Sequence, residues 1–199
     1  MVKLHTWLPS PPNALLQGIR PDAGHSSMEI IADDGSLLAY VSYWPEPGTL
    51  IGDITQIMKP RPQRHPATYS QEIDPDIGYM QRPSDFTDGV DGLDEDTVIE
   101  LWTSIEDTGY DLLHWNCSNV VKVLILSSFD PVQREQLLEV AGCTPDDLAK
   151  ISGTQDTFEK LRYLATSPFI DCRPEDVRRM LQAFAELKRT TESFAHVDE

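Results

Sequence analysis

The chain has 199 residues, of which 16 are Lys or Arg and 33 are Asp or Glu, so its formal net charge is −17. This balance argues against nucleic-acid binding, which depends on neutralising phosphates with basic side chains, and against docking on an anionic membrane surface. A hydrophobic content of 40% is sufficient for a buried core, so we expect a globular protein that acts on a substrate or binds a basic protein partner.

Hydropathy and cysteine usage bound the compartment and the cofactors. No run approaches the roughly 18 apolar residues of a membrane span, and the first seven residues lack the apolar stretch of a signal peptide. We therefore expect no membrane insertion and, by default, a cytoplasmic location, with delivery by a dedicated secretion machine as the alternative. The three cysteines, at 117, 143 and 172, have no metal-ligand spacing, so we expect neither a metal nor another cofactor.

The first elements in the chain are predicted to be strands. Val2–Leu8 alternates between apolar and polar residues, and a Pro-rich turn follows it. Residues 25–44 predict a β-hairpin, because Asp34-Gly35 is a strong two-residue turn signal between two strand-like runs.

The two faces of this hairpin differ in polarity. The predicted register pairs His25 with Trp44 and Ala32 with Leu37. One face is apolar and should face the core: Met28, Ile30, Ala32, Leu37, Ala39, Val41 and Tyr43. The other face is more polar: His25, Ser27, Glu29, Tyr40, Ser42 and Trp44. His25 is therefore predicted at the open end of the hairpin, on its polar face.

Residues 45–92 show little periodicity. We expect short strands over 52–58 and 77–81, with the remainder forming a wall beside the site. The acidic run 88–96 lacks the spacing and the closing Glu of an EF-hand. Asp94 is better explained as the N-cap of a helix over residues 95–106.

Residues 130–199 predict a helical extension packed on a core domain of residues 1–129. Four helices are expected, over residues 131–141, 145–151, 157–165 and 174–194. The last is amphipathic, with an apolar stripe of Val177, Met180, Leu181, Phe184 and Leu187. Packing onto the core explains this stripe better than a separate partner-binding module does.

Cys117 lies where an apolar helix should begin. Asn116 is a good N-cap for that helix, so the thiol lies at the positive end of the helix dipole, which stabilises a thiolate. Such a cysteine is a candidate nucleophile if a base lies nearby, and a buried packing residue if none does. His25 is the candidate base, and the pair can form if the helix packs across the polar face of the hairpin.

The two halves of this pattern together resemble a known family. Gly24-His25 is followed roughly ninety residues later by Tyr-x-Leu-Leu-x-x-Asn-Cys over residues 110–117. This order resembles the permuted papain-like cysteine hydrolases, the circularly permuted relatives of the NlpC/P60 peptidases that include lecithin:retinol acyltransferase-like and PPPDE-type proteins. In ordinary papain-like enzymes the cysteine precedes the histidine, whereas here the histidine comes first, as in the permuted group. The resemblance covers roughly residues 1–128.

The resemblance implies an α+β, papain-like fold in which a small antiparallel sheet packs on the Cys-bearing helix. It implies Cys117 as nucleophile and His25 as general base. The polar ring residue that lecithin:retinol acyltransferase-like proteins carry on the next strand is missing here. Hairpin geometry therefore nominates Ser42 as the third catalytic residue, with a backbone carbonyl as the alternative. Oxyanion support is expected from Asn116, Ser118 and His114, and substrate contact from Trp44, Tyr43 and Ser27.

The expected function is hydrolysis of an amide bond in a peptide or isopeptide through an acyl-enzyme. Because the permuted relatives also act on thioesters and lipid acyl groups, a thioesterase, lipid acyl hydrolase or acyltransferase is the alternative. A delivered bacterial effector is one setting that the resemblance implies. A second alternative is a non-catalytic acidic immunity or adaptor protein that binds a basic partner, which the net charge of −17 favours. A catalytic thiol must be partly accessible and close to His25.

Overall fold

The fold is known from a computed structural model, which describes residues 1–9, 24–44, 66–76, 78–107, 116–128 and 173–195. In chain order the elements are β1 (Val2–Trp7), β2 (His25–Ile31), β3 (Leu37–Ser42), α1 (Tyr69–Ile73), β4 (Phe86–Val90), α2 (Glu95–Ile105), α3 (Cys117–Ser127) and α7 (Pro174–Ala195). The predicted strand over 52–58 and the predicted helices over 131–141, 145–151 and 157–165 lie outside the described residues.

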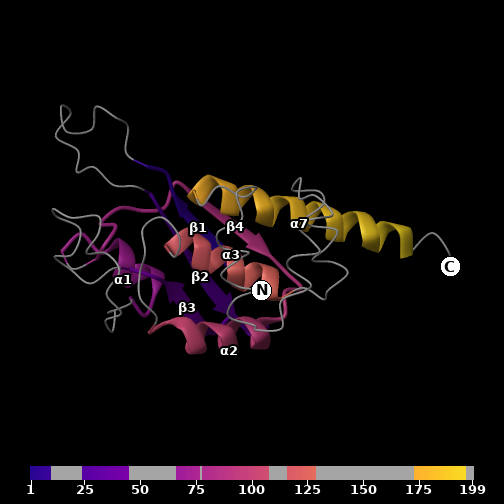
Figure 1. The fold of residues 1–199 in the computed structure, drawn as a ribbon, viewed down its shortest axis with the longest axis horizontal. Helices are drawn as coiled ribbons and strands as arrows, with labels where there is room; N and C mark the ends of the chain where they lie inside the picture. Colours follow the sequence, from indigo (N-terminus) through magenta and orange to yellow (C-terminus); the bar gives the residue numbers. More distant parts are fainter. Residues whose placement is uncertain (10–23, 45–65, 77, 108–115, 129–172, 196–199) are drawn as a thin grey trace, which may run out of the picture.

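The four strands form one antiparallel sheet in the order β3-β2-β1-β4 (Figure 1). β1 pairs with β2 from Val2↔Ile30 to Trp7↔His25, and with β4 from Val2↔Val90 to Thr6↔Phe86. The described part of the chain is therefore an α+β fold built on a small antiparallel sheet, as the sequence predicts.

The hairpin of β2 and β3 keeps the predicted register in its middle, where Met28 pairs with Val41 and Ser27 pairs with Ser42. The β2–β3 ladder ends at Ser27↔Ser42, so His25 and Trp44 form no ladder pair, although the register is the predicted one and their rings stack; on its other side His25 pairs with Trp7 of β1. The imidazole is thereby held by a central strand of the sheet.

The tip of the hairpin differs from the prediction. The Ala32 N–H donates to the Ser36 carbonyl and the Gly35 N–H donates to the Ala32 carbonyl, both at 2.9 Å, so the loop holds residues 33–35 rather than two residues. Leu37 consequently pairs with Ile31, and an irregularity between Ile30 and Ile31 restores the register further along. Leu37, expected in the core, is 40% exposed because the longer loop carries it beyond the covered part of the sheet.

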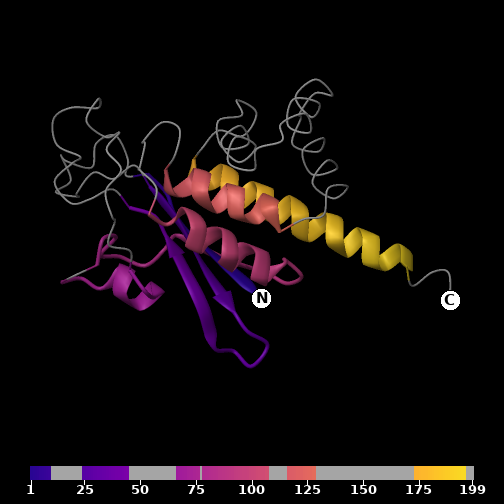
Figure 2. The same ribbon diagram turned by 60° about the horizontal axis from the view of Figure 1, so that its bottom comes forward.

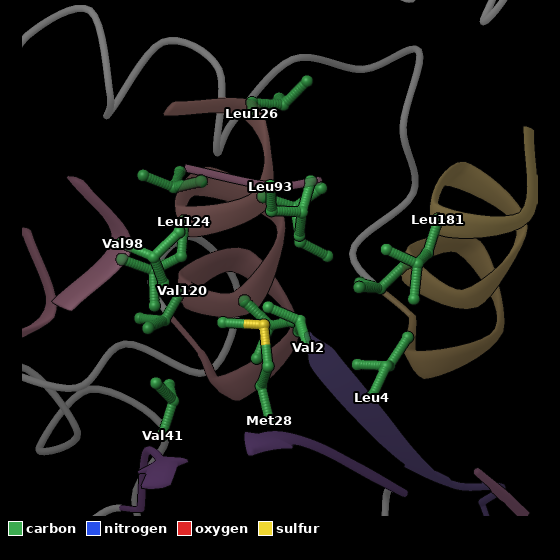
Figure 3. Close-up of a cluster of buried hydrophobic side chains, with 14 of the residues drawn as sticks. Val2, Leu4, Met28, Val41, Leu93, Val98, Val120, Leu124, Leu126 and Leu181 are labelled. Atoms are coloured by element: carbon green, nitrogen blue, oxygen red, sulfur yellow. The ribbon is translucent and has the colours of Figure 1, made fainter. Parts of the chain in front are cut away.

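One face of the sheet is covered by α2, α3 and α7, and α1 lies on the opposite side (Figure 2). α3 is central to the core, with ten of its 11 residues buried. Figure 3 shows side chains of the sheet and of the helices facing one another, among them Val2, Leu4, Met28, Val41, Val98, Val120, Leu124 and Leu181. Because nearly all of α3 is buried on this face of the sheet, the position of the helix is fixed, and so is the position of its first residue.

Two elements were not predicted, α1 and β4, and one predicted strand is wrong. In the described part of the predicted strand over 77–81, which excludes residue 77, the chain forms no strand, and Tyr79 and Met80 lie in a bend. The backbone donors of this segment are used elsewhere, because the Met80 and Gln81 N–H groups both point to the Glu72 carbonyl of α1, at 3.1 and 3.4 Å. This segment therefore folds back onto α1 and cannot pair with a strand through those donors.

α7 confirms the predicted last helix and its packing. Four residues of the predicted stripe belong to the same buried cluster as α3 and β1: Val177, Met180, Leu181 and Phe184. Among the described residues, no helix combines the length and the apolar character needed to cross a bilayer.

Candidate functional site

Cys117 is the first residue of α3, as predicted. The Asn116 side chain accepts the Asn119 N–H at 3.0 Å, and the Asn119 side chain accepts the Asn116 N–H at 3.2 Å, which makes a reciprocal capping box. Such a box satisfies backbone donors that a helix otherwise leaves free at its start. The capped first turn places the Cys117 sulfur at the positive end of the helix.

His25 is the first residue of β2 and follows Gly24, a position where any other residue would be strained. Gly24 has φ +78°, and a Cβ built there would lie 2.7 Å from the Trp7 carbonyl oxygen and 2.9 Å from the Pro9 nitrogen. The chain therefore enters β2 in close contact with the end of β1, and His25 is fixed at that edge. This explains the Gly-His pair in physical terms.

The thiol and the imidazole meet although α3 packs on the face of the sheet opposite to His25. Ser26 points toward α3, with its hydroxyl 3.3 Å from that of Ser118. At the start of β2 the Cys117 thiol is near enough to the His25 ring and to the Ser26 backbone N–H for both to lower its pKa. The predicted route to the pair, with the helix across the polar face, is therefore replaced by contact around the end of the sheet.

Glu72 of α1 is the partner of His25 that the sequence did not reveal. Its Oε1 lies 3.0 Å from His25 Nε2, and both side chains are almost fully buried. The charges of Glu72 and of the Cys117 thiol both act on this ring. Sulfur, imidazole and carboxylate thus stand in sequence, which is the order of a nucleophile, a base and an orienting group.

The Glu72 carboxylate is surrounded by donors from one face of the β3 region, because alternate residues of a strand point the same way. Ser42 Oγ and Trp44 Nε1 each donate to Oε1 at 2.7 Å, and the Tyr40 hydroxyl donates to Oε2. Trp44 also stacks on the His25 ring, with centroids 4.2 Å apart and planes at 22°. A buried carboxylate with this many hydrogen bonds stays ionised.

Burial and charge act in opposite directions on all three groups. Burial lowers the pKa of His25, but the Cys117 and Glu72 charges outweigh it and raise that pKa from 6.5 to about 10. Burial raises the pKa of the Cys117 thiol, but the His25 charge and hydrogen bonds hold that pKa below its usual value. Burial likewise raises the pKa of Glu72, and the His25 charge with three side-chain donors lowers it from 4.5 to about 2. The charges favour a thiolate–imidazolium pair backed by a carboxylate.

The site is closed in this structure. Cys117 is 6% exposed, His25 1% and Glu72 not at all. Exclusion of water from around the pair strengthens its electrostatic interactions. A substrate carbonyl can reach the sulfur only when the site opens.

Ser42 and the residues nominated for support are placed as follows. Ser42 Oγ lies 3.2 Å from His25 Nε2 and donates to Glu72, so it lies beside the ring but is directed to the carboxylate. Asn116 forms the cap described above. Ser118 is buried against Ser26, with its hydroxyl 4.0 Å from the Cys117 sulfur. His114 lies outside the described residues.

The three residues expected to contact substrate are not on an open surface. Trp44 is half-buried and covers His25, as described above. Tyr43 is 1% exposed and packs edge-on against Trp102 in the core. Ser27 is fully buried and bonds the Tyr40 hydroxyl at 2.8 Å. The expectation that Tyr43 and Ser27 bind substrate is corrected, because the core and the polar network occupy their side chains.

Two sequence signals point toward Glu72. Thr68-Tyr-Ser-Gln71 matches a helix-start pattern, and the Thr68 side chain does accept the Gln71 N–H at 3.2 Å. In addition, the polar hairpin face carries several donors and so requires a buried acceptor. Neither signal selects one carboxylate among 33 acidic residues, because the contact depends on how α1 docks.

The acidic run near β4 has structural partners. Asp94 caps α2, as predicted, by accepting the Thr97 N–H at 3.1 Å. Asp88 accepts from Arg178 Nε at 2.6 Å and from Gln182 at 3.2 Å. Within the described residues, no group of three or more His, Cys, Asp or Glu side chains is arranged to hold a metal ion.

No family model matches the chain, and neither a curated protein nor a solved structure matches it. Its function must therefore be inferred from the arrangement of Cys117, His25 and Glu72.

Proposed function

We propose that this protein is a cysteine hydrolase that cleaves an amide bond in a peptide or isopeptide. Cys117 is the nucleophile, His25 the general acid and base, and Glu72 the group that orients the imidazole. The observation that carries the proposal is a buried His25 ring that lies 3.0 Å from the Glu72 carboxylate and interacts electrostatically with the Cys117 thiol. Packing residues alone would not require three ionisable side chains in this order.

The proposed reaction has two halves. In the first, the Cys117 thiolate attacks the carbonyl carbon, and the imidazolium of His25 protonates the leaving amine as the C–N bond breaks, which leaves a thioester. In the second, His25 takes a proton from water, the hydroxide adds to the thioester, and the carboxylic acid leaves as the thiolate returns. In this proposal the backbone N–H of Cys117, at the start of α3, binds the oxyanion.

We also propose the permuted papain-like assignment for the fold. In its favour are the antiparallel sheet that packs on the Cys-bearing helix α3 and the position of His25 at the start of a strand that precedes that helix in sequence. The carboxylate comes from α1, between the two, which fits the order histidine, acid, cysteine.

Alkylation of Cys117 by iodoacetamide against pH tests the proposal, in a protein whose Cys143 and Cys172 are replaced by Ser. We expect the alkylation rate to report a thiol pKa well below the roughly 8.5 of a free cysteine. His25→Ala should remove that advantage. A library of peptides and isopeptide-linked peptides, analysed by mass spectrometry, should then show cleavage that Cys117→Ala abolishes.

A second candidate is the non-catalytic acidic binding protein, which the closed site and the net charge of −17 favour. Under this alternative, alkylation is slow, titrates like an ordinary thiol and is indifferent to His25→Ala. That result would overturn the hydrolase proposal.

A further inference from the structure

The Glu72 carboxylate is bonded unequally at its two oxygens. Oε1 faces His25, Ser42 and Trp44. Within the described part of the chain, Oε2 has one hydrogen-bond partner, the hydroxyl of Tyr40. One phenol therefore holds the side of the carboxylate that points away from the imidazole.

Tyr40 is itself fixed. It is 6% exposed, and its oxygen lies 2.8 Å from the hydroxyl of Ser27 on the neighbouring strand β2. Burial raises the pKa of the Tyr40 hydroxyl, and the Glu72 charge raises it further, so the phenol stays protonated. It can therefore donate to Glu72 at neutral pH.

We propose that Tyr40 is a positioning residue of the site: with Ser27 behind it, the phenol holds Glu72 Oε2 and so fixes the carboxylate against His25. This inference rests on the proposed function and adds a third layer to the site, behind the carboxylate. Tyr40 touches neither the sulfur nor the imidazole in any contact described above.

The physical reason is the cost of a buried charge with an unpartnered oxygen. Without the phenol, Oε2 would lie in the interior with no donor from the described residues, which disfavours the ionised carboxylate. A less stable carboxylate stabilises the imidazolium less, and a less stable imidazolium stabilises the thiolate less. The effect of Tyr40 should therefore be read at Cys117, through the pH at which the thiolate forms.

The test compares the pH dependence of Cys117 alkylation in the wild type and in Tyr40→Phe, which keeps the ring and removes only the hydroxyl. We expect the acid limb of the profile to move upward by about one pH unit, so that alkylation at any pH on that limb is roughly tenfold slower. The pH at which the ultraviolet absorbance of the thiolate appears should rise as well.

Tyr69→Phe is the matched control. Tyr69 is in α1, three residues before Glu72, and its hydroxyl bonds Ser84 at 3.1 Å rather than the carboxylate. This variant removes a phenol hydroxyl from α1, the helix that carries Glu72, but leaves every hydrogen bond of Glu72 in place. A loss of stability alone would affect both variants, whereas the shift of the acid limb should appear in Tyr40→Phe only.

Ser27→Ala decides the question if Tyr40→Phe does not fold. It leaves the phenol in place, removes its anchor, and should move the acid limb in the same direction by a smaller amount. An acid limb that coincides with that of the wild type and of Tyr69→Phe would overturn the role of Tyr40 and leave the hydrolase proposal standing. An ordinary thiol titration in the wild type would overturn the hydrolase proposal itself, and the inference with it.

Discussion

At the scale of single residues, the site depends on how a carboxylate with no exposed surface stays charged. Glu72 has hydrogen bonds to both oxygens and a cationic partner in His25. An ion pair of this kind does not by itself add stability, because removing two charges from water is costly. Breaking it is costly too, since the remaining charge has no partner. Glu72 is therefore a sensitive point for both stability and chemistry.

Glu72→Gln should lower the free energy of unfolding at pH 7 by about 3 kcal/mol, because it removes one of the two negative charges that face the imidazolium and places the amide N–H donors opposite other donors. The folded-state pKa of Glu72 lies below its unfolded value, at about 2 against 4.5. Its stabilisation is therefore complete above pH 4.5 and is lost as the pH falls through about 2. Urea denaturation of the wild type and variant across this range should show the difference shrinking as the pH falls.

Glu29→Gln provides the comparison. Glu29 lies on the same face of the sheet and bonds His5 Nε2 at 3.2 Å, but it is partly exposed. We expect a loss of about 1 kcal/mol, since the amide can still accept that hydrogen bond. Equal losses of stability in the two variants at pH 7 would contradict the claim that the buried charge of Glu72 is the more costly one to remove.

At the scale of elements, the position of His25 depends on the close approach of β1 and β2 at Gly24. Gly24 and Gly35 have similar positive φ, +78° and +85°, yet their surroundings differ. A Cβ at Gly24 would press on backbone atoms of Trp7 and Pro9, whereas a Cβ at Gly35 would meet nothing within 4 Å. The two glycines therefore separate backbone strain from steric clash.

Gly35→Ala should cost about 1 kcal/mol from backbone strain alone. Gly24→Ala should cost about 3 kcal/mol, because β1 or β2 must also shift. The strand shift in Gly24→Ala moves His25, whereas Gly35→Ala leaves His25 in place. Only Gly24→Ala should therefore raise the pH at which Cys117 becomes reactive. Urea denaturation and alkylation profiles check both statements; similar costs in the two variants would show that β1 and β2 can separate freely.

The predictability of these elements follows from how local their causes are. α2 and α3 were predicted because Asp94 and Asn116 are strong caps before periodic apolar runs. The middle of the hairpin followed from alternation, but its tip did not, since the three-residue loop depends on local turn geometry. α1 has only five residues and no apolar period, so its existence and the place of Glu72 depend on tertiary contacts. Cys117 and His25 were found from the sequence, whereas the carboxylate between them in the chain was not.

At the scale of the whole molecule, α7 packs into the same hydrophobic core that contains Cys117. Leu181 is fully buried in the cluster that also contains Val2 and Val120. On the outside, Arg178 pairs with Asp88 of β4 and lies 4.0 Å over the Phe86 ring. Contacts of both kinds tie α7 to β4 and to the sheet, so we expect α7 to unfold together with residues 1–128.

Leu181→Ala tests this unity. Removing a fully buried leucine side chain should lower the free energy of unfolding by about 3 kcal/mol. Because α7 shares its cluster with α3, the loss should appear in a single cooperative transition, followed equally by far-ultraviolet circular dichroism and by the fluorescence of the four Trp residues, all of which lie outside α7. Gln182→Ala, at the exposed neighbouring position, should change stability by no more than about 0.5 kcal/mol. If Leu181→Ala instead melts α7 in a separate early transition while the Trp fluorescence stays native, α7 is a dispensable appendage and the site is held by the sheet and α3 alone.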